Sequence, residues 1–250
     1  MRIILLACEG RHELAILPRL AVTLGWDTRR GITAEDPESI QRLVPQPPRP
    51  SGRDFSWRVP PRPVFLRRAD DWMVVQRFDG DQKLRKEAPL YAQQIGSELA
   101  AIGLVVDGDD KGPEQRAQQF QGTFERWLAR ELRAGSVTDG SPRLGLWVSP
   151  DNSSGGNFDD LLEAAAKQGR MELVRNAREL VARQSPFEGL SDAKLRKAML
   201  GIVAQADTPA GSLFDSASKW TGWLAGGPHA GPFAPLCAFL EELTREYDDG

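Results

Sequence analysis

The chain has 250 residues, a formal net charge of −3 and two cysteines, Cys8 and Cys237, far apart in the sequence. This length suffices for one large α/β domain, or for a domain with a helical appendage, around a substantial core. The cysteines lack the C-x-x-C spacing of a zinc or redox motif, and no apolar run is long enough for a membrane span or for the core of a signal peptide. We therefore expect a soluble, cytoplasmic protein with two buried thiols and no membrane partner.

One stretch departs from the weakly acidic average. Between Arg29 and Arg68 there are nine arginines against four acidic residues, interleaved with Phe55 and Trp57 and broken by prolines. Such a run is typical of a proline-stiffened surface loop, and it also fits an arm that contacts nucleic acid, with Trp57 as a stacking residue. The net charge itself argues against a protein that holds nucleic acid by bulk charge, because phosphate contacts need clustered Lys and Arg.

The pattern of apolar residues predicts strands that alternate with helices over the first two thirds of the chain. Taken in chain order, they are a strand at 2–7, a helix at 12–24, a strand at 72–78, a helix at 82–101, a strand at 102–106, a helix at 113–133 and a strand at 144–148. Strands that alternate with helices indicate an α/β fold, with a parallel sheet and helices on both of its faces.

Beyond residue 157 the periodicity is helical. Helices are predicted at 158–167, 171–184, 192–205, 213–224 and 233–247. We therefore expect an α/β domain over residues 1–168, with the basic stretch at about 29–68 as an insertion, and a helical C-terminal region over residues 169–250 packed on it.

Acidic residues follow three of the four predicted strands. They are, in chain order, Glu9, Glu13, Asp107, Asp109 and Asp151. The carboxyl ends of parallel strands meet at the edge where such sheets bind ligands, so we expect these side chains to converge. Carboxylates without His or Cys partners form a hard-oxygen site that suits Mg²⁺ or Mn²⁺ better than zinc. Such ions activate water and stabilise the leaving oxygen in phosphodiester chemistry.

Each acid also has a purely structural interpretation. Asp107 and Asp109, on either side of Gly108, fit a turn that caps the next helix. Glu13 falls in the first turn of a predicted helix, where the macrodipole favours negative charge. The joint placement of the acids at strand ends is what favours the metal site.

The motif Glu9-Gly10-Arg11-His12-Glu13 after the first strand, followed later by Asp107-Gly108-Asp109, resembles the Toprim domain of topoisomerases, primases and OLD-type (overcoming lysogenization defect) nucleases. Haloacid-dehalogenase phosphatases also use a D-x-D motif, but theirs follows the first strand. A glutamate at position 13 is closer to the E-G-x-x-E of OLD-type nucleases. Residues 144–163 and 216–227 are also similar to segments of small stand-alone Toprim-like proteins of bacteria and archaea.

The resemblance implies a Toprim, Rossmann-like sheet and a role for each central acid. Glu9 matches the Toprim glutamate, which is a general acid or base or, in the nucleases, a metal ligand. Asp107 and Asp109 match the D-x-D metal ligands, and Glu13 matches the second-metal acid of the OLD-type enzymes.

Further positions follow from the same resemblance. Asp151, together with Asp159 or Asp160, falls in a segment where an acid completes the metal shell. Lys219 lies in a matching helical segment, where a lysine neutralises charge that develops in the transition state. An ordinary surface lysine fits the same position.

Two activities of the family are excluded by missing residues. A topoisomerase needs a nucleophilic tyrosine on an additional domain, and the only tyrosines are Tyr91 and Tyr247. A bacterial primase brings a zinc module rich in Cys and His, whereas His12 and His229 are the only histidines here. His12 beside the motif is most simply an incidental neighbour.

The resemblance implies a Mg²⁺- or Mn²⁺-dependent endonuclease that hydrolyses DNA or RNA. OLD-type nucleases are controlled by an ABC-type ATPase, and this sequence has no P-loop, so an ATPase would be a separate partner in an anti-phage defence system. Two alternatives stay open, a catalytically silent Toprim-like interaction subunit of an ATPase complex and a phosphohydrolase of small esters. The helical C-terminal region leaves surface for a homo-oligomer.

Overall fold

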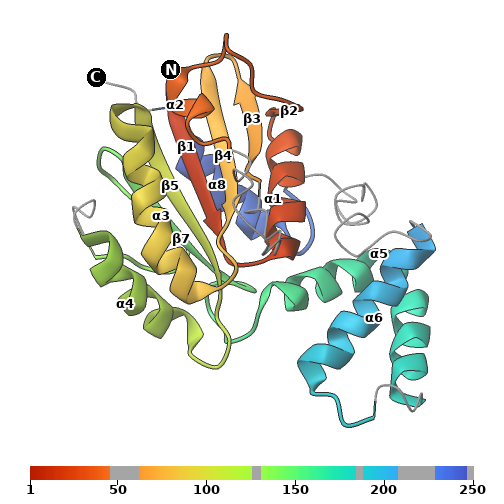
Figure 1. Ribbon diagram of the computed structural model, residues 1–250. Coiled ribbons are helices and arrows are strands. Elements are labelled where there is room, and N and C mark those ends of the chain that lie inside the picture. Colours follow the sequence, from red (N-terminus) through yellow and green to blue (C-terminus); the bar gives the residue numbers. More distant parts are fainter. Residues whose placement is uncertain (46–61, 126–130, 184–187, 208–228, 247–250) are drawn as a thin grey trace, which may run out of the picture.

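The chain forms a mixed α/β fold around one seven-stranded sheet (Figure 1). The computed structural model describes residues 1–45, 62–125, 131–183, 188–207 and 229–246. The strands are β1 (Ile3–Cys8), β2 (Asp27–Arg29), β3 (Val64–Arg68), β4 (Asp71–Arg77), β5 (Leu99–Asp107), β6 (Ser136–Thr138) and β7 (Arg143–Ser149). The helices of the described ranges are α1 (Arg11–Thr23), α2 (Glu38–Gln41), α3 (Asp81–Ile95), the 3₁₀ turn η1 (Gly96–Glu98), α4 (Gly112–Phe124), α5 (Phe158–Arg183), α6 (Asp192–Asp207) and α8 (Ala234–Thr244).

The strand order in the sheet is β2-β3-β4-β1-β5-β7-β6. The four central strands β4, β1, β5 and β7 are parallel, which confirms the sheet expected from the alternation of strands and helices. The edges differ from that expectation, because β2, β3 and β6 were not predicted and pair antiparallel. Two of these strands have only three residues, too few to show a period.

Strand β3 lies at the end of the basic stretch and belongs to the sheet, not to a surface loop. Its arginines pack on tryptophans, with the Arg68 guanidinium 4.6 Å from the ring centroid of Trp26 and that of Arg67 5.8 Å from Trp72. These charged side chains interrupt the apolar pattern that would otherwise reveal the strand. Residues 46–61, which include Trp57, lie outside the described ranges.

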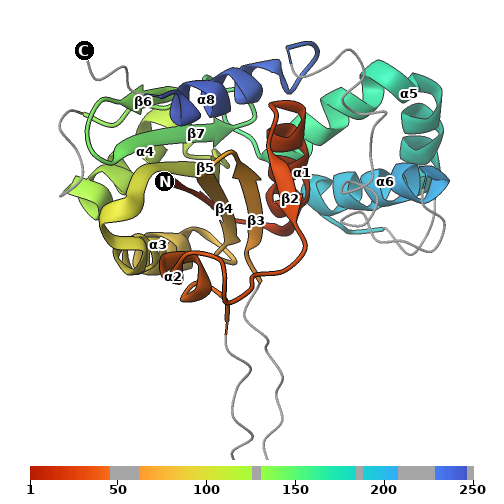
Figure 2. The ribbon, with the colours of Figure 1, turned by 90° about the horizontal axis from the view of Figure 1, so that it is seen from above.

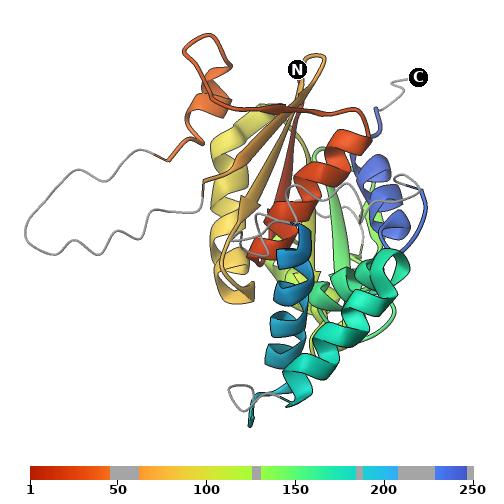
Figure 3. The same cartoon turned by 90° about the vertical axis from the view of Figure 1, so that its right-hand side faces the viewer.

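Helices cover both faces of the sheet, as expected (Figure 3). Alternate residues of β1 supply the two cores because successive side chains of a strand point to opposite faces. Ile4 and Leu6 pack in the core that contains α1, α5, α6 and α8, whereas Ile3 and Leu5 pack in the core that contains α2, α3 and α4. A central strand buried on both sides therefore appears in the sequence as a continuous apolar run.

Two predicted helices end earlier than expected. The helix predicted to residue 101 ends at Ile95, because Gly96 adopts a φ of +76° and the chain then enters β5 at Leu99. The helix predicted for 113–133 ends at Phe124, and residues 126–130 lie outside the described ranges.

The C-terminal region begins inside a helix that starts in the α/β layer. Helix α5 runs across residues 168 and 169 with a kink at Arg170, and its second half packs against α6 beside the sheet (Figure 1). Helix α8 then returns to the face of the sheet that α1 covers. The helix predicted at 213–224 falls outside the described residues. Within the described ranges, no helix has the length and apolar character that a bilayer span requires.

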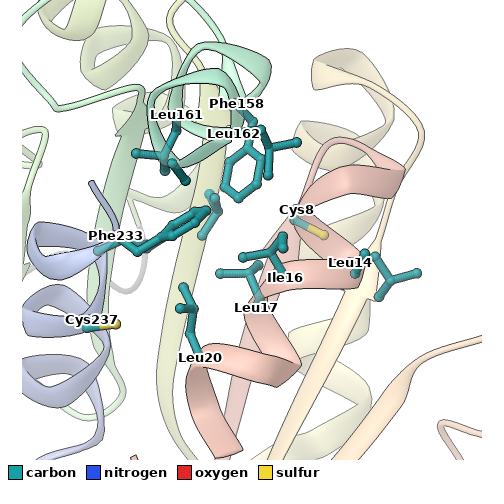
Figure 4. Packing of buried hydrophobic residues seen from close by; sticks show 14 of the residues in the cluster. Cys8, Leu14, Ile16, Leu17, Leu20, Phe158, Leu161, Leu162, Phe233 and Cys237 are labelled. Atoms are coloured by element: carbon teal, nitrogen blue, oxygen red, sulfur yellow. The ribbon is translucent and has the colours of Figure 1, made fainter. Parts of the chain in front are cut away.

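The start of α5 is fixed between α1 and α8. Figure 4 shows Phe158 and Phe233 facing the apolar side of α1, and their ring centroids are 6.4 Å apart. Phe158 and Phe233 are 2 % and 1 % exposed, respectively. This packing fixes the first turn of α5 at the carboxyl end of the sheet, next to the acidic residues.

Helix α8 approaches the sheet closely because two strands carry glycine beneath it (Figure 2). A Cβ atom at Gly103 of β5 would lie 2.5 Å from Leu243 Cδ2 and 2.6 Å from Leu6 Cδ2. A Cβ atom at Gly145 of β7 would lie 2.9 Å from the ring of Phe239. The contact between α8 and the sheet therefore depends on the absence of these side chains.

Gly103→Ala is expected to lower the free energy of unfolding by about 1–3 kcal/mol, because the added methyl group overpacks a fully buried contact. Urea denaturation of the variant and of the parent chain measures this difference. The matched control is Gly201→Ala in α6, where a Cβ would meet nothing within 4 Å and alanine should stabilise the helix by about 0.5–1 kcal/mol. Equal stability of Gly103→Ala and the parent would show that α8 does not pack this closely.

Candidate functional site

The candidate site lies where β1 and β5 end side by side. Glu9 follows β1, and its backbone is fixed to the turn after β4, because the Gly80 N–H donates to the Glu9 carbonyl oxygen at 3.0 Å and the Phe78 N–H to that of Cys8 at 2.9 Å. Cys8 pairs with Val105 in the parallel register of β1 and β5. Glu9 thus lies beside the end of β5, which carries Asp107.

Glu13 lies in the first turn of α1 and folds back toward the start of the helix. A Cβ atom at Gly10 would lie 2.6 Å from Glu13 Oε2, so glycine leaves the space that the carboxyl group occupies. Glu13 is 3 % exposed. The positive end of the helix dipole partly compensates a negative charge at this place.

The loop after β7 holds the Asp107-Gly108-Asp109 segment. The Gly108 N–H donates to the Ser149 carbonyl oxygen at 3.1 Å, and Asp109 and Gly156 exchange two backbone hydrogen bonds of 2.6 and 3.0 Å. A Cβ atom at Gly108 would lie 2.9 Å from the Ser149 oxygen, so the two loops touch through a glycine. The first residue of α5 completes this clasp, because the Phe158 N–H donates to Asp107 Oδ1 at 2.7 Å.

Burial and mutual repulsion make these carboxyl groups hard to ionise. Burial, followed by the charge of Asp107, raises the pKa of Glu9 to about 8, although Arg116 opposes the shift. Burial raises the pKa of Asp107 to about 6, partly offset by the Phe158 N–H. Burial and the charge of Asp107 raise the pKa of Glu13 well above its ordinary value. The cluster therefore holds more carboxyl groups than the surrounding positive charge can neutralise.

Sequence reasoning missed two residues of the site, Arg116 in α4 and Asp81 at the start of α3. Arg116 is 2 % exposed, and its Nη2 lies 2.5 Å from Asp109 Oδ2 and 4.0 Å from Glu9 Oε1. Its Nη1 lies 2.9 Å from Asp81 Oδ2. Two signals were present in the sequence. Asp81 also follows a strand, and Arg116 precedes Phe120 by four residues, on the inner face of its helix.

Asp159 lies close enough to the cluster to raise the pKa of both Asp107 and Glu13 by its charge. It is already engaged, because His12 Nδ1 lies 2.5 Å from Asp159 Oδ1 and Lys197 Nζ lies 3.7 Å from Oδ2. His12 therefore has a defined partner, Asp159, beside the cluster.

Two other predicted positions, Asp151 and Asp160, have hydrogen-bond or ion-pair partners of their own. Asp151 accepts hydrogen bonds from the backbone and side chain of its own turn, at Ser153 and Ser154. Although burial opposes it, these hydrogen bonds lower the pKa of Asp151. Asp160 accepts the Asn157 N–H at 2.8 Å and pairs with Arg196 of α6. Lys219 lies outside the described residues.

The sequence matches, over residues 4–244, the family model described as "Protein of unknown function (DUF3226)". The chain belongs to the DUF3226 family. Its structure is similar to the crystal structure of the hypothetical protein PH0156 from Pyrococcus horikoshii OT3, with 18% identity and a TM-score of 0.61 over 97% of this chain and 95% of that one. No curated protein matches the sequence. At this identity the likeness concerns the fold alone.

The carboxylate oxygens at the site of this DUF3226 chain are the type of ligand that a hard divalent cation prefers. They are not arranged as a coordination shell. In the parts of the chain that the structure describes, no group of three or more His, Cys, Asp or Glu side chains is arranged to hold a metal ion. Glu9 Oε1, however, is buried without a hydrogen-bond partner. A buried carboxylate oxygen left in this way is costly unless water or a cation satisfies it.

The pKa of Glu9 predicts how the stability of the DUF3226 fold depends on pH. Its folded-state pKa is about 8 against an ordinary value of 4.5, so the folded chain binds more protons than the unfolded chain between these values. The stabilisation is complete below the ordinary value and is lost as the pH rises through about 8. Without divalent cations, the free energy of unfolding should therefore fall across this range.

Urea denaturation at both ends of that pH range, without divalent cations, measures the slope. Glu9→Gln should flatten it, because glutamine carries no charge at any pH. The control Asp151→Asn should leave it unchanged, since the pKa of Asp151 lies below its ordinary value. An unaltered slope in Glu9→Gln would mean that Glu9 is ionised in the folded chain throughout the range.

Proposed function

We propose that this protein is a metal-dependent endonuclease that hydrolyses nucleic-acid phosphodiesters with Mg²⁺ or Mn²⁺. The observation that carries the proposal is the convergence of Glu9, Glu13 and Asp107 at the carboxyl ends of β1 and β5, with the pKa of each raised by burial and by neighbouring negative charge. Excess carboxyl groups at a ligand-binding edge are typical of hard-cation sites. The resemblance of the two acidic motifs to Toprim nucleases supports the same chemistry.

Glu9, Glu13 and Asp107 would hold the cation. When bound, the cation would supply an activated water and stabilise negative charge on the leaving oxygen. The backbone clasp between the Asp107–Asp109 segment and the loop after β7 would fix the position of Asp107. Fixed ligands lower the cost of ordering the site when substrate binds.

Cations on one side of the cluster would receive the phosphate groups of a nucleic acid. Lys111 Nζ and Arg85 Nη2 lie 3.9 and 3.7 Å from Asp81 Oδ2, and their side chains are 42% and 35% exposed. Such contacts supply sequence-independent affinity for a phosphate backbone. The net charge of −3 fits a protein that also depends on a partner to bind its substrate. An OLD-type ATPase of an anti-phage defence system is the partner that the Toprim resemblance implies.

One observation favours a second function, a catalytically silent interaction subunit of an ATPase complex. Asp109, the second residue of the D-x-D motif, is bound to Arg116. A site whose ligand is held by an internal cation could retain the fold without retaining catalysis. The two functions differ in whether the isolated chain binds Mn²⁺.

Cleavage of supercoiled plasmid and of total RNA in the presence of Mn²⁺ tests the proposal. Glu9→Gln and Asp107→Asn should each reduce the initial rate by at least about tenfold, because each removes a negatively charged ligand without changing its size. Asp151→Asn, whose carboxyl group is bonded within its own turn, should keep the parent rate. The preferred polymer identifies the substrate class.

A parent chain that neither cleaves nor binds Mn²⁺ would overturn the nuclease in favour of the interaction subunit. Cleavage that survives in both Glu9→Gln and Asp107→Asn would place the activity elsewhere or in a contaminant. Thermal unfolding curves of the variants establish that each one is folded.

A further inference from the structure

A cavity of about 680 Å³ lies beside the acidic cluster, between α4, residues 131–134 and the loop after β7. Glu114, Gln118 and Gln121 form its wall on α4, because residues at positions i, i+4 and i+7 share one face of a helix. Asn152 lines it from the loop after β7. Its volume is that of a small-molecule site, and the proposed chemistry at the carboxyl groups makes no use of it.

We infer that this cavity binds a guanine base of the nucleic-acid substrate. The inference rests on the proposed function and deepens it, because it names a base that the substrate presents beside the acidic cluster. The binding of guanine itself requires neither a metal ion nor cleavage. It can therefore be tested separately from the nuclease.

The cavity and the cluster are built on the same two elements. Arg116 of the cluster and Gln118 of the cavity are two residues apart on α4, so they lie on nearly opposite faces, roughly 200° apart around the helix. The loop after β7 carries Asn152 to the cavity, and its Gly156 exchanges backbone hydrogen bonds with Asp109. A substrate at the cluster is thus adjacent to the cavity.

The orientation of two amide groups carries the choice of base. Gln121 Oε1 accepts the Leu132 N–H at 2.7 Å. Asn152 Oδ1 accepts the Val148 N–H at 2.6 Å. These hydrogen bonds identify the oxygen of each amide and leave its NH₂ group as a donor on the wall of the cavity. One edge of guanine presents two acceptors, O6 and N7, whereas the same edge of adenine presents an acceptor and a donor.

The charge of the wall favours a base over a phosphate group. Arg133 is neutralised by Glu131, with 3.1 Å between Nη2 and Oε2, so Glu114 is the excess charge of the described wall. A carboxylate repels a phosphate group, but it accepts N–H donors such as the N2 amino group of guanine. Ala117 and Leu132 supply apolar surface for the face of the ring.

The experiment is a titration of the full chain with guanosine and with adenosine in EDTA, followed by saturation-transfer NMR of the nucleoside. The parent chain should bind guanosine at least about tenfold more tightly than adenosine, as expected for one set of base contacts. Gln121→Glu and Asn152→Asp should each weaken guanosine binding by at least about tenfold. Each variant keeps the oxygen that accepts the backbone N–H and replaces only the NH₂ donor. Aspartate also tolerates the φ of +63° at position 152.

Gln115→Glu is the matched control, because it makes the same change at an exposed position of α4 that does not line the cavity. It should keep the parent Kd for guanosine, which is itself uncharged. Undetectable guanosine binding by the parent, equal binding of adenosine, or unchanged binding in both lining variants would overturn the guanine site. Cleavage with Mn²⁺ that depends on Glu9 would still stand in each of these cases. Circular dichroism of the variants shows that a loss of binding is not a loss of fold.

Discussion

The repulsion among carboxyl groups at the ends of β1 and β5 is the constraint on which the rest of the site depends. Glu9 and Glu13 are buried, and neither could stay ionised beside Asp107 without positive charge nearby. Arg116 supplies part of that charge from α4 and holds Asp109 in a direct ion pair. Burial and the remaining excess of negative charge together explain the raised pKa values.

Close backbone contacts hold the acidic segments together against this repulsion. Glycine lets the carboxyl group of Glu13 pack at position 10 and lets the loop after β7 reach position 108. Phe158, fixed in the core against Phe233, presents its N–H to Asp107. The apolar core thus fixes the first turn of α5, and that turn fixes a ligand of the proposed metal site. Stability and chemistry are linked at this point.

The central strands were predictable, because apolar runs reveal strands that are buried on both faces. The four acids Glu9, Glu13, Asp107 and Asp109 were expected to meet, because parallel strands end at one edge of the sheet. The short edge strands were not predictable, since three residues show no period and the arginines of β3 mask its apolar side. Arg116 was missed because its burial depends on Asp81 and Asp109, distant in sequence from each other. Asp151 was expected as a ligand, and its carboxyl group is bonded to Ser153 and Ser154 of its own turn.

The motif Asp107-Gly108-Asp109 looks symmetric in the sequence, yet its two carboxyl groups have different surroundings. Burial raises the pKa of Asp107 to about 6, although the Phe158 N–H opposes the shift. The charges of Asp109 and Asp159 raise it further. Asp109 faces a permanent positive charge and is half exposed. Paired carboxyl groups take different roles when their environments differ in this way. A short motif therefore specifies which residues come together, and the tertiary environment, here Arg116, determines the charge that each of them faces.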